Sequence, residues 1–305
     1  RYMTKQLSKS ITVAIPSWNS AKQIKKNLPS VIKAAKRVNA EIIIVDDASS
    51  DDSVAVIKGD WGYPIKLVQN PTNQGYGETI NRAVALAQSE LVVILNTDVS
   101  LSDDCIEKSL PYFVDPSVFA LGLNSGEGYM RVKWDRGLFH HFKGITGVED
   151  KSVTPFSLWA SGGQSVIRRS YWLELGGMCP LYKPFYWEDT DLGYAAWKRG
   201  YTILWGRDCR CVHDHESSVI AGSFGKKEVM DVAQRNQFLF IWKNISDAGL
   251  LLTHLLYLPI YLIRYPRTVI SALRNLPTAL KYRKLQSQYW TRYDEDILSI
   301  WRDSQ

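Results

Sequence analysis

Cysteine is scarce in this chain of 305 residues, which contains only Cys105, Cys179, Cys209 and Cys211. Four irregularly spaced cysteines do not make a disulfide framework, and they suit a reducing compartment. Cys209 and Cys211 have C-x-C spacing, but no second pair accompanies them. We therefore interpret all four as packing residues rather than zinc ligands. No apolar signal segment is visible, and residues 1–10 are interpreted as a polar lead or an expression remnant.

Acidic residues are absent between Asp247 and Asp294, an interval that contains seven basic residues: Arg264, Arg267, Arg274, Lys281, Arg283, Lys284 and Arg292. The net charge of the whole chain is +6, so the remainder is nearly neutral (+6 minus 7 is −1). Because the basic charge is confined to one segment, we do not expect nucleic acid as a partner. The sequence also lacks a membrane-spanning run, which needs ~20 apolar residues. Its apolar stretch 250–265 is interrupted by His254 and Pro259.

A basic tail that begins with an apolar stretch is typical of helices lying on an anionic membrane surface. The alternative is packing against the rest of the chain or against a partner subunit in a homo-oligomer. We favour the membrane surface and expect the tail, residues 225–305, to fold separately from residues 11–224.

Short apolar segments alternate with amphipathic ones over the first hundred residues, which predicts βαβ units and a mainly parallel, Rossmann-like sheet flanked by helices. The strands are expected at 11–16, 41–46, 65–69 and 91–95, and helices at 21–38 and 78–88. Pro29 should kink or split the first helix. Residues 125–155 have weak periodicity and are predicted to form a long loop. Two further strands are expected at 201–205 and 210–213, before a helical tail.

Polar residues follow three of these strands, at the edge where parallel strands of an open sheet bind ligands. They are Pro16, Ser17, Trp18 and Asn19 after the first strand, Asp46 and Asp47 after the second, and Asn96, Thr97 and Asp98 after the fourth. A flat indole, a carboxylate for a base or ribose hydroxyl, and a carboxylate for a divalent cation predict a nucleoside-diphosphate site. The alternative for Asp98 is an ordinary turn. Asn73 and Gly75, in a glycine-rich loop, are weaker candidates for the same site.

Five segments together resemble the family 2 inverting glycosyltransferases of the GT-A fold. They are "ITVAIPSWNSA", "EIIIVDDASSDDS", "NQGYGETINRAVALAQSELVVILNTDV", "ASGGQSVIRRSYWLELGG" and "FYWEDTDLGYAAWKRGY". The resemblance runs from about Ile11 to His215 and implies a GT-A domain at 11–224, with a nucleotide-binding half at 11–124 and an acceptor half at 125–224. The family's Asp-x-Asp motif is Asn96-Thr97-Asp98 here. The resemblance therefore assigns a divalent cation, Mn²⁺ or Mg²⁺, to Asp98, and a ribose or water contact to Asn96.

Three of the four residues in the segment Glu188-Asp189-Thr190-Asp191 are acidic. Transfer of a sugar with inversion needs a base that takes the proton from the attacking hydroxyl. The resemblance makes Asp189 that base, with Glu188 and Asp191 positioning the acceptor or neighbouring groups. The alternative is helix capping, for which one acid is enough.

Other residues near these segments complete the expected site. The resemblance implies that His213 completes the metal site, with His215 a weaker candidate, and imidazole is a competent ligand for Mn²⁺. Gly162 and Gly163 would let the backbone approach a sugar, or would simply make a turn. Trp187, in an aromatic setting before the acids, is grouped with the sugar-nucleotide contacts.

The function expected from these features is metal-dependent transfer, with inversion, of a hexose from a UDP- or dTDP-sugar to a hydroxyl of a glycan or lipid-linked acceptor. We expect it at the cytoplasmic face of a membrane, in cell-surface polysaccharide synthesis. One rival is a sugar nucleotidyltransferase, but "PSWNSAKQ" is not the basic, glycine-rich triphosphate loop that such an enzyme needs. The other rival is a non-catalytic membrane- or glycan-binding protein of the same fold.

Overall fold

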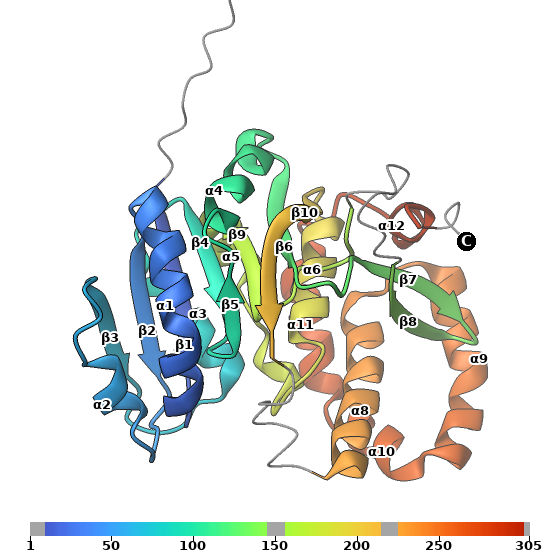
Figure 1. The fold of residues 1–305 in the computed structure, drawn as a ribbon. Coiled ribbons are helices and arrows are strands. Elements are labelled where there is room, and N and C mark those ends of the chain that lie inside the picture. The colour runs from blue at the N-terminus through green and yellow to red at the C-terminus, as the bar shows by residue number, and fades with distance from the viewer. Residues whose placement is uncertain (1–9, 145–155, 215–224, 302–305) are drawn as a thin grey trace, which may run out of the picture.

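The computed structural model describes residues 10–144, 156–214 and 225–301 (Figure 1). At its centre is an eight-stranded sheet with the strand order β3-β2-β1-β4-β9-β6-β10-β5. These strands are β1 (Ile11–Ser17), β2 (Glu41–Asp46), β3 (Ile65–Gln69), β4 (Leu91–Leu95), β5 (Val99–Leu101), β6 (Val118–Asn124), β9 (Gln164–Arg168) and β10 (Thr202–His213). The first four are mutually parallel, β9 is antiparallel to β4 and β6, and β10 is parallel to β6. The predicted α/β fold is confirmed.

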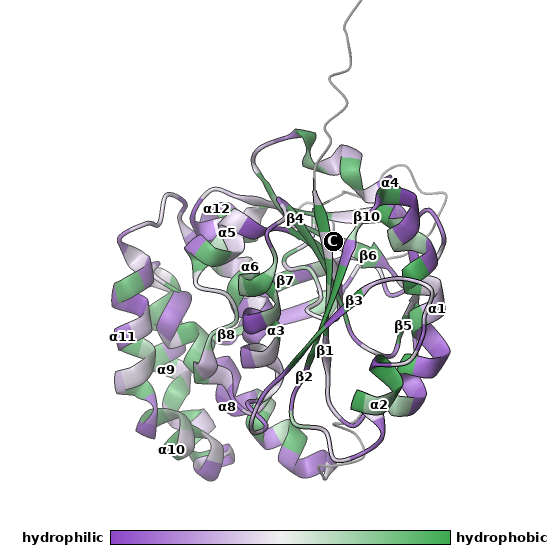
Figure 2. Cartoon of the chain, turned by 90° about the vertical axis from the view of Figure 1, so that its left-hand side faces the viewer, coloured by the Kyte–Doolittle hydropathy of each residue, from purple (hydrophilic) through white to green (hydrophobic). Residues whose placement is uncertain are grey.

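Helices cover both faces of the sheet, as the view turned by 90° shows (Figure 2). One layer contains α1 (Ala21–Val38), α2 (Ser53–Ile57), α4 (Cys105–Ser109) and the short η1 (Leu110–Val114). The other contains α3 (Tyr76–Leu86), α5 (Arg169–Leu175), η2 (Pro180–Tyr182) and α6 (Glu188–Lys198). Successive strand residues point to opposite faces, so Val13 packs in the core under α1 while Ala14 packs in the core under α3. Two apolar cores result, one on each face of the sheet. The edge formed by the carboxyl ends of the parallel strands is left free for polar residues.

A hairpin occupies residues 130–143 of the segment 125–155, which was predicted to be a loop, so that expectation is wrong there. Residues 145–155 of the same prediction lie outside the described residues. Strands β7 (Met130–Asp135) and β8 (Leu138–Lys143) pair antiparallel. Their two-residue turn has positive φ at both central residues, 48° at Arg136 and 73° at Gly137, which is the geometry that matches the twist of a hairpin. Strand β7 does alternate, with apolar Met130, Val132 and Trp134 between polar residues, but β8 does not, because Leu138 and Phe139 are adjacent and both buried.

Two smaller expectations also differ from the structure. Helix α1 continues through Pro29, which lies on its exposed side, so the helix is not split. The two strands expected between 201 and 213 are one strand, β10, whose register with β6 shifts between Gly206 and Arg210. An irregularity of this kind lets one strand re-aim its end, and in β10 that end is His213.

The C-terminal segment consists of α8 (Lys226–Asn244), α9 (Ala248–Arg264), α10 (Pro266–Arg274), α11 (Leu276–Ser287) and α12 (Asp294–Ser299). Within the described residues, none of the helices combines the length and apolar character that crossing a bilayer requires. The expectation that this segment folds separately is wrong. Buried ion pairs join it to α6: Lys243 lies 2.5 Å from Asp191, and Asp294 lies 2.9 Å from Lys198.

Candidate active site

The strand register brings the predicted polar tips together at one edge of the sheet. Ser17 at the end of β1 lies opposite Asp46 at the end of β2, and Ala14 lies opposite Ile94 of β4, so all three strands end at similar heights. The amide of Asp47 donates to the Ser17 carbonyl at 2.7 Å, which extends the pairing beyond the strands. Pro16 and Ser17 are buried, whereas the Trp18 ring is 38% exposed at this edge. The arrangement leaves a flat aromatic surface beside the strand tips.

Asp47 and its neighbours build the wall of this edge. One carboxylate oxygen of Asp47 accepts from Asn70 Nδ2 at 2.6 Å and from the Gln74 amide at 2.8 Å, and the other accepts from the Gly75 amide at 2.9 Å. Asp47 therefore fixes the glycine-rich loop, in which Asn73 Oδ1 also accepts from the Gly75 amide.

Asp46 and Asn19 hold the turn that follows β2. Buried Asp46 accepts from the Ser49 hydroxyl at 2.6 Å and from the Ser49 amide at 3.0 Å. Asn19, whose φ is 48°, accepts from the Ser50 amide at 2.8 Å. Asp46 and Asn19 thus have structural partners in addition to the nucleotide contacts predicted for them.

Asp98 and His213 meet where β4 ends and β10 ends. Asp98 Oδ1 lies 3.2 Å from His213 Nε2, and both side chains are largely buried. Asp98 Oδ1 accepts no hydrogen bond from any residue that the structure describes. Asn27 Nδ2 donates to the Thr97 carbonyl at 2.9 Å and thereby anchors the turn that carries Asp98. A buried carboxylate oxygen without a donor, beside an imidazole, fits a divalent cation.

Few side chains other than these two could bind a metal ion here. Over the described ranges, no group of three His, Cys, Asp or Glu side chains is arranged to hold a metal ion. A cation at Asp98 and His213 would therefore rely on oxygens from the diphosphate or from water. His215, the weaker candidate, lies outside the described residues.

The glycines expected to approach a sugar have close neighbours within the chain. A Cβ at Gly163 would lie 2.4 Å from the side-chain amide nitrogen of Asn96, and the Asn96 amide donates to the Gly163 carbonyl at 2.8 Å. A Cβ at Gly162 would lie 2.7 Å from Met178 Cε. A side chain at Gly163 would clash with Asn96, whereas one at Gly162 would displace the flexible end of Met178. A contact of either glycine with the sugar stays a prediction.

Glu188 and Asp189 open α6 beside the same edge. Burial and the adjacent Asp189 raise the pKa of Glu188 to about 8. Burial also raises the pKa of Asp189, although the amides of Thr190 and Gly162 stabilise its charged form. Glu188 Oε2 is buried and makes no hydrogen bond to a described residue. A carboxyl whose pKa is raised towards neutral pH can accept a proton there, which is what a general base requires.

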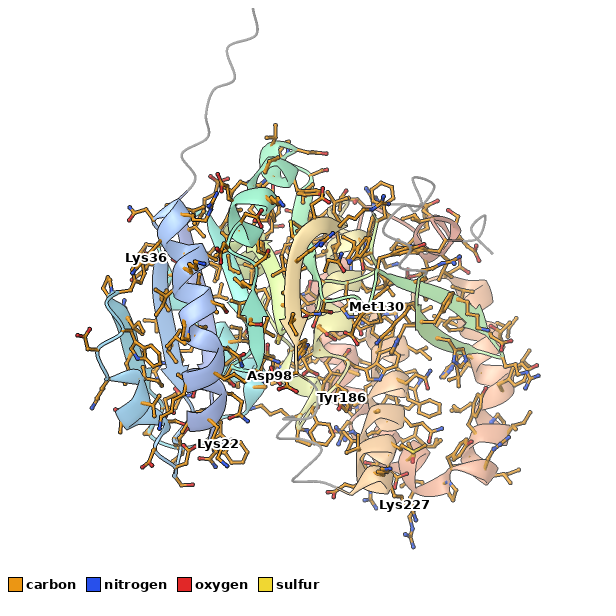
Figure 3. All side chains as sticks on the ribbon, in the orientation of Figure 1. Lys22, Lys36, Asp98, Met130, Tyr186 and Lys227 are labelled. Atoms are coloured by element: carbon orange, nitrogen blue, oxygen red, sulfur yellow. The ribbon has the colours of Figure 1, made fainter. Side chains whose placement is uncertain are left out.

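Tyr76 was not predicted from the sequence, yet it connects the two halves of the site. Its hydroxyl donates to the Gly162 carbonyl. Burial raises its pKa far above the usual value, and the charges of Glu188, Asp189 and Asp98 raise it further. All three carboxylates are therefore near this one phenol, and Figure 3 shows Asp98 and Tyr186, just before α6, at the same edge of the sheet. The only sequence signal was its place in the glycine-rich loop.

Asp191 and Trp187 have other surroundings than expected. The Asp191 carboxylate accepts from Tyr182 at 2.7 Å and from Asn244 Nδ2 at 2.6 Å, besides its ion pair with Lys243. It is bound to α8, so it positions α6 rather than the acceptor. Trp187 is buried, with its ring centroid 5.2 Å from that of Phe240. It packs in the aromatic core instead of presenting a free face to a sugar nucleotide.

Comparison with known proteins identifies the family of the chain. The family model described as Glycosyl transferase family 2 matches residues 12–176, more than half of the chain. The chain belongs to glycosyltransferase family 2. An uncharacterized glycosyltransferase of Haemophilus influenzae is 28% identical over 106 residues, which cover 34% of this chain and 42% of that protein. The chain matches less than half of the length of the first curated relatives.

Solved structures of glycosyltransferases have the same fold as this family 2 chain. GalNAc-T7 with UDP, GalNAc and Mn²⁺ superposes with a TM-score of 0.61 at 19% identity, covering 77% of this chain and 48% of that one. TarS 1–349 of S. aureus with UDP-GlcNAc superposes with a TM-score of 0.60 at 16% identity, covering 97% and 92% respectively. At such identities the likeness shows the GT-A fold alone.

Proposed function

We propose that this family 2 glycosyltransferase moves a hexose, with inversion and with a divalent cation, from a UDP- or dTDP-sugar to a hydroxyl of a glycan or lipid-linked acceptor. The observation that carries the proposal is the meeting of two kinds of group at one sheet edge. The pair Asp98 and His213 suits a cation and a diphosphate, and the carboxyls of Glu188 and Asp189 suit proton transfer. Tyr76 lies near all three carboxylates. The solved structures of GalNAc-T7 with UDP, GalNAc and Mn²⁺ and of TarS 1–349 with UDP-GlcNAc support the same class of donor and cation.

In the proposed reaction, Asp189 takes the proton of the acceptor hydroxyl while that oxygen bonds to the anomeric carbon. The bond from this carbon to the diphosphate oxygen breaks, and the diphosphate leaves with the bonding electrons. A divalent cation bound by Asp98 and His213 would stabilise the charge on the departing diphosphate. Glu188, protonated below its pKa of about 8, can donate a hydrogen bond to the acceptor or the sugar. Trp18, Asp46 and Asn96 are proposed to contact the base and ribose.

The cytoplasmic membrane face is proposed as the place of reaction, within cell-surface polysaccharide synthesis. Helix α9 forms the edge of the molecule opposite β3 (Figure 1). It exposes apolar side chains at helical spacing: Leu252, Leu255, Leu256, Ile260 and Ile263. Five exposed cations follow nearby in sequence without any acid: Arg264, Arg267, Arg274, Lys281 and Lys284. Apolar side chains combined with positive charge favour an anionic bilayer. A homo-oligomer formed through the same helices is the alternative.

The test is nucleotide release from a panel of UDP-glucose, UDP-N-acetylglucosamine, UDP-galactose, GDP-mannose and dTDP-rhamnose, with Mn²⁺ and with EDTA. We expect one of these donors to yield free nucleoside diphosphate and sugar only when Mn²⁺ is present. Release of pyrophosphate from a nucleoside triphosphate and a sugar phosphate would instead favour a nucleotidyltransferase. Donor binding without any turnover would favour a non-catalytic binding protein. The anomeric configuration of the first-formed product, followed by NMR, tests inversion.

A further inference from the structure

The backbone of residues 183–188, which connect η2 to Asp189, has an unusual conformation. Tyr186 and Trp187 both have left-handed conformations, with φ of 67° and 82°. Residues with a Cβ adopt this region rarely, and two in succession persist only where the surroundings hold them. The conformation matters for the site because the Trp187 carbonyl accepts the first bond of α6, from the Asp191 amide at 2.8 Å. The direction of this peptide therefore sets where Glu188 and Asp189 point.

Asn236 of α8 holds this segment from behind. The side chain is fully buried, and its Nδ2 donates to three carbonyl oxygens: Tyr182 at 2.8 Å, Phe185 at 3.0 Å and Tyr186 at 2.9 Å. Its Oδ1 accepts from Arg235 Nε at 3.0 Å and from Arg235 Nη2 at 2.8 Å. The orientation of the amide is chemically determined, because carbonyls only accept and a guanidinium only donates. The two hydrogens of Nδ2 are thus shared among three carbonyl oxygens, all of them in the segment that leads into α6.

A second contact, about two turns further along α8, shows that this helix holds α6 at two points. Lys243 and Asn244, seven and eight residues after Asn236, bind the Asp191 carboxylate in the first turn of α6. Residues at this spacing lie on one side of a helix. Asn236 binds the segment before the acidic pair, and Lys243 binds the turn after it.

We propose that Asn236 is a positioning residue of the transferase site: by holding Tyr186 and Trp187 in left-handed conformations, it aims Glu188 and Asp189 at the acceptor. This inference rests on the proposed function. It assigns to α8, which lies beyond the segment matched by the family model, a part in the transfer step. Asn236 does not touch the strand tips at which the nucleotide is proposed to bind, so its effect should fall on turnover and not on donor binding.

The first test compares Asn236→Ala with Gln237→Ala, using the donor of the panel that the wild-type chain hydrolyses fastest. Gln237 is the matched control, since its Nε2 also donates to a backbone carbonyl, that of Phe139 at 2.8 Å, but on β8. For Asn236→Ala we expect kcat to fall at least tenfold, with the donor KM and the Kd for UDP with Mn²⁺ within threefold of wild type. Gln237→Ala should keep wild-type kcat. Each kcat is divided by the fraction of chains that bind UDP, so that misfolded protein does not count.

The second test does not depend on Asn236→Ala being stable. Tyr186→Gly and Tyr186→Val both remove the ring, but glycine adopts positive φ freely and a β-branched residue resists it. We expect kcat of Tyr186→Val to be at least fivefold below that of Tyr186→Gly. We also expect Asn236→Ala to cost less in the Tyr186→Gly background than in the wild type.

Three results would overturn the inference. Equal kcat for the Gly and Val variants would show that the backbone conformation at Tyr186 has no role in turnover. A parallel loss of UDP binding and kcat in Asn236→Ala would indicate a general structural role. An unchanged kcat in Asn236→Ala would remove the role altogether while leaving the proposed function standing. If the wild-type chain turned over no donor, the proposed function would fail first, and this inference with it.

Discussion

The ammonium of Lys198 lies 2.9 Å from the carboxylate of Asp294, and neither side chain is exposed to solvent. The pair joins the last turn of α6 to the first residue of α12, almost a hundred residues later. Asp294 also accepts from the Tyr194 hydroxyl at 2.6 Å and from the amides of Ser246 and Asp247 at 2.7 Å. The C-terminal helices are therefore bound to the helix that carries the acidic pair, and they belong to the same folded unit.

Replacing Asp294 should strongly destabilise the chain. Asp294→Ala leaves the Lys198 ammonium buried without its counter-charge, and breaking a buried pair in this way costs about 3–5 kcal/mol. Urea unfolding should show the loss as a lower midpoint. The control is Asp103→Ala, which breaks the exposed pair between Lys33 and Asp103, 2.7 Å apart, and should leave the midpoint nearly unchanged. Equal effects of the two variants would contradict the buried role of Asp294.

The membrane proposal is best tested with point variants, because removing residues 245–305 would expose Lys198 and part of the apolar core. The double variant Leu255→Ser and Leu256→Ser should bind vesicles of phosphatidylglycerol and phosphatidylcholine about a hundredfold more weakly or worse, since each leucine buried in the bilayer contributes about 1.5–3 kcal/mol. Val114→Ser is the matched control, as Val114 is 66% exposed, like Leu256, but lies on η1.

Salt separates the two contributions to vesicle binding. Added NaCl should weaken binding of the wild-type chain without abolishing it, because Coulomb attraction is screened while apolar burial is not. A wild-type chain that ignores anionic vesicles at low salt would refute the membrane proposal. An oligomer formed through α9 would then be the better explanation of its apolar side chains.

The strand tips could be predicted from the sequence because periodicity and turn residues are local signals. The buried strand 91–95, with Asp98 three residues after it, predicts both an element and a site position, and the parallel topology implies that the strand ends lie together. The groups that hold the acidic pair could not be predicted in this way. Asn236, Lys243 and Tyr76 become meaningful only through contacts with residues far away in the chain. Polar residues are frequent along α8 and in the glycine-rich loop, so the local sequence does not distinguish these three from their neighbours.

The raised pKa of Glu188 predicts a dependence of stability on pH. Its pKa is about 8 in the folded chain, mainly through burial, against an ordinary value of 4.5. The folded state therefore holds this proton more tightly, so the contribution of Glu188 to stability is present below pH 4.5 and is lost as the pH rises towards 8. Glu188→Gln cannot titrate and should show a smaller loss of stability between pH 5 and 8. Thermal unfolding in EDTA across this range measures the difference. A wild-type profile as flat as that of the variant would speak against a buried, protonated Glu188.

Asp98→Ala should abolish metal-dependent transfer without unfolding the chain. Losing this carboxylate removes a cation ligand, so the charge of the leaving diphosphate is not neutralised in the transition state. Calorimetry should show that Mn²⁺ no longer strengthens UDP binding, and turnover should be abolished. His213→Ala should have the same effect in a weaker form, since Asp98 is retained. Unchanged turnover of Asp98→Ala at saturating Mn²⁺ would place the cation elsewhere.

The most direct test of the account is the behaviour of Asp189→Asn. The amide keeps the shape of the side chain but cannot accept the proton of the attacking hydroxyl, a contribution of typically 10²–10⁴-fold to the rate. The measurement is kcat for transfer, or for donor hydrolysis, beside the Kd for UDP with Mn²⁺ on the same preparation. We expect kcat to fall by a factor on the order of 10² or more while the Kd stays within threefold of wild type. A kcat within a few-fold of wild type would contradict the assignment of Asp189 as the base and would direct the search to Glu188.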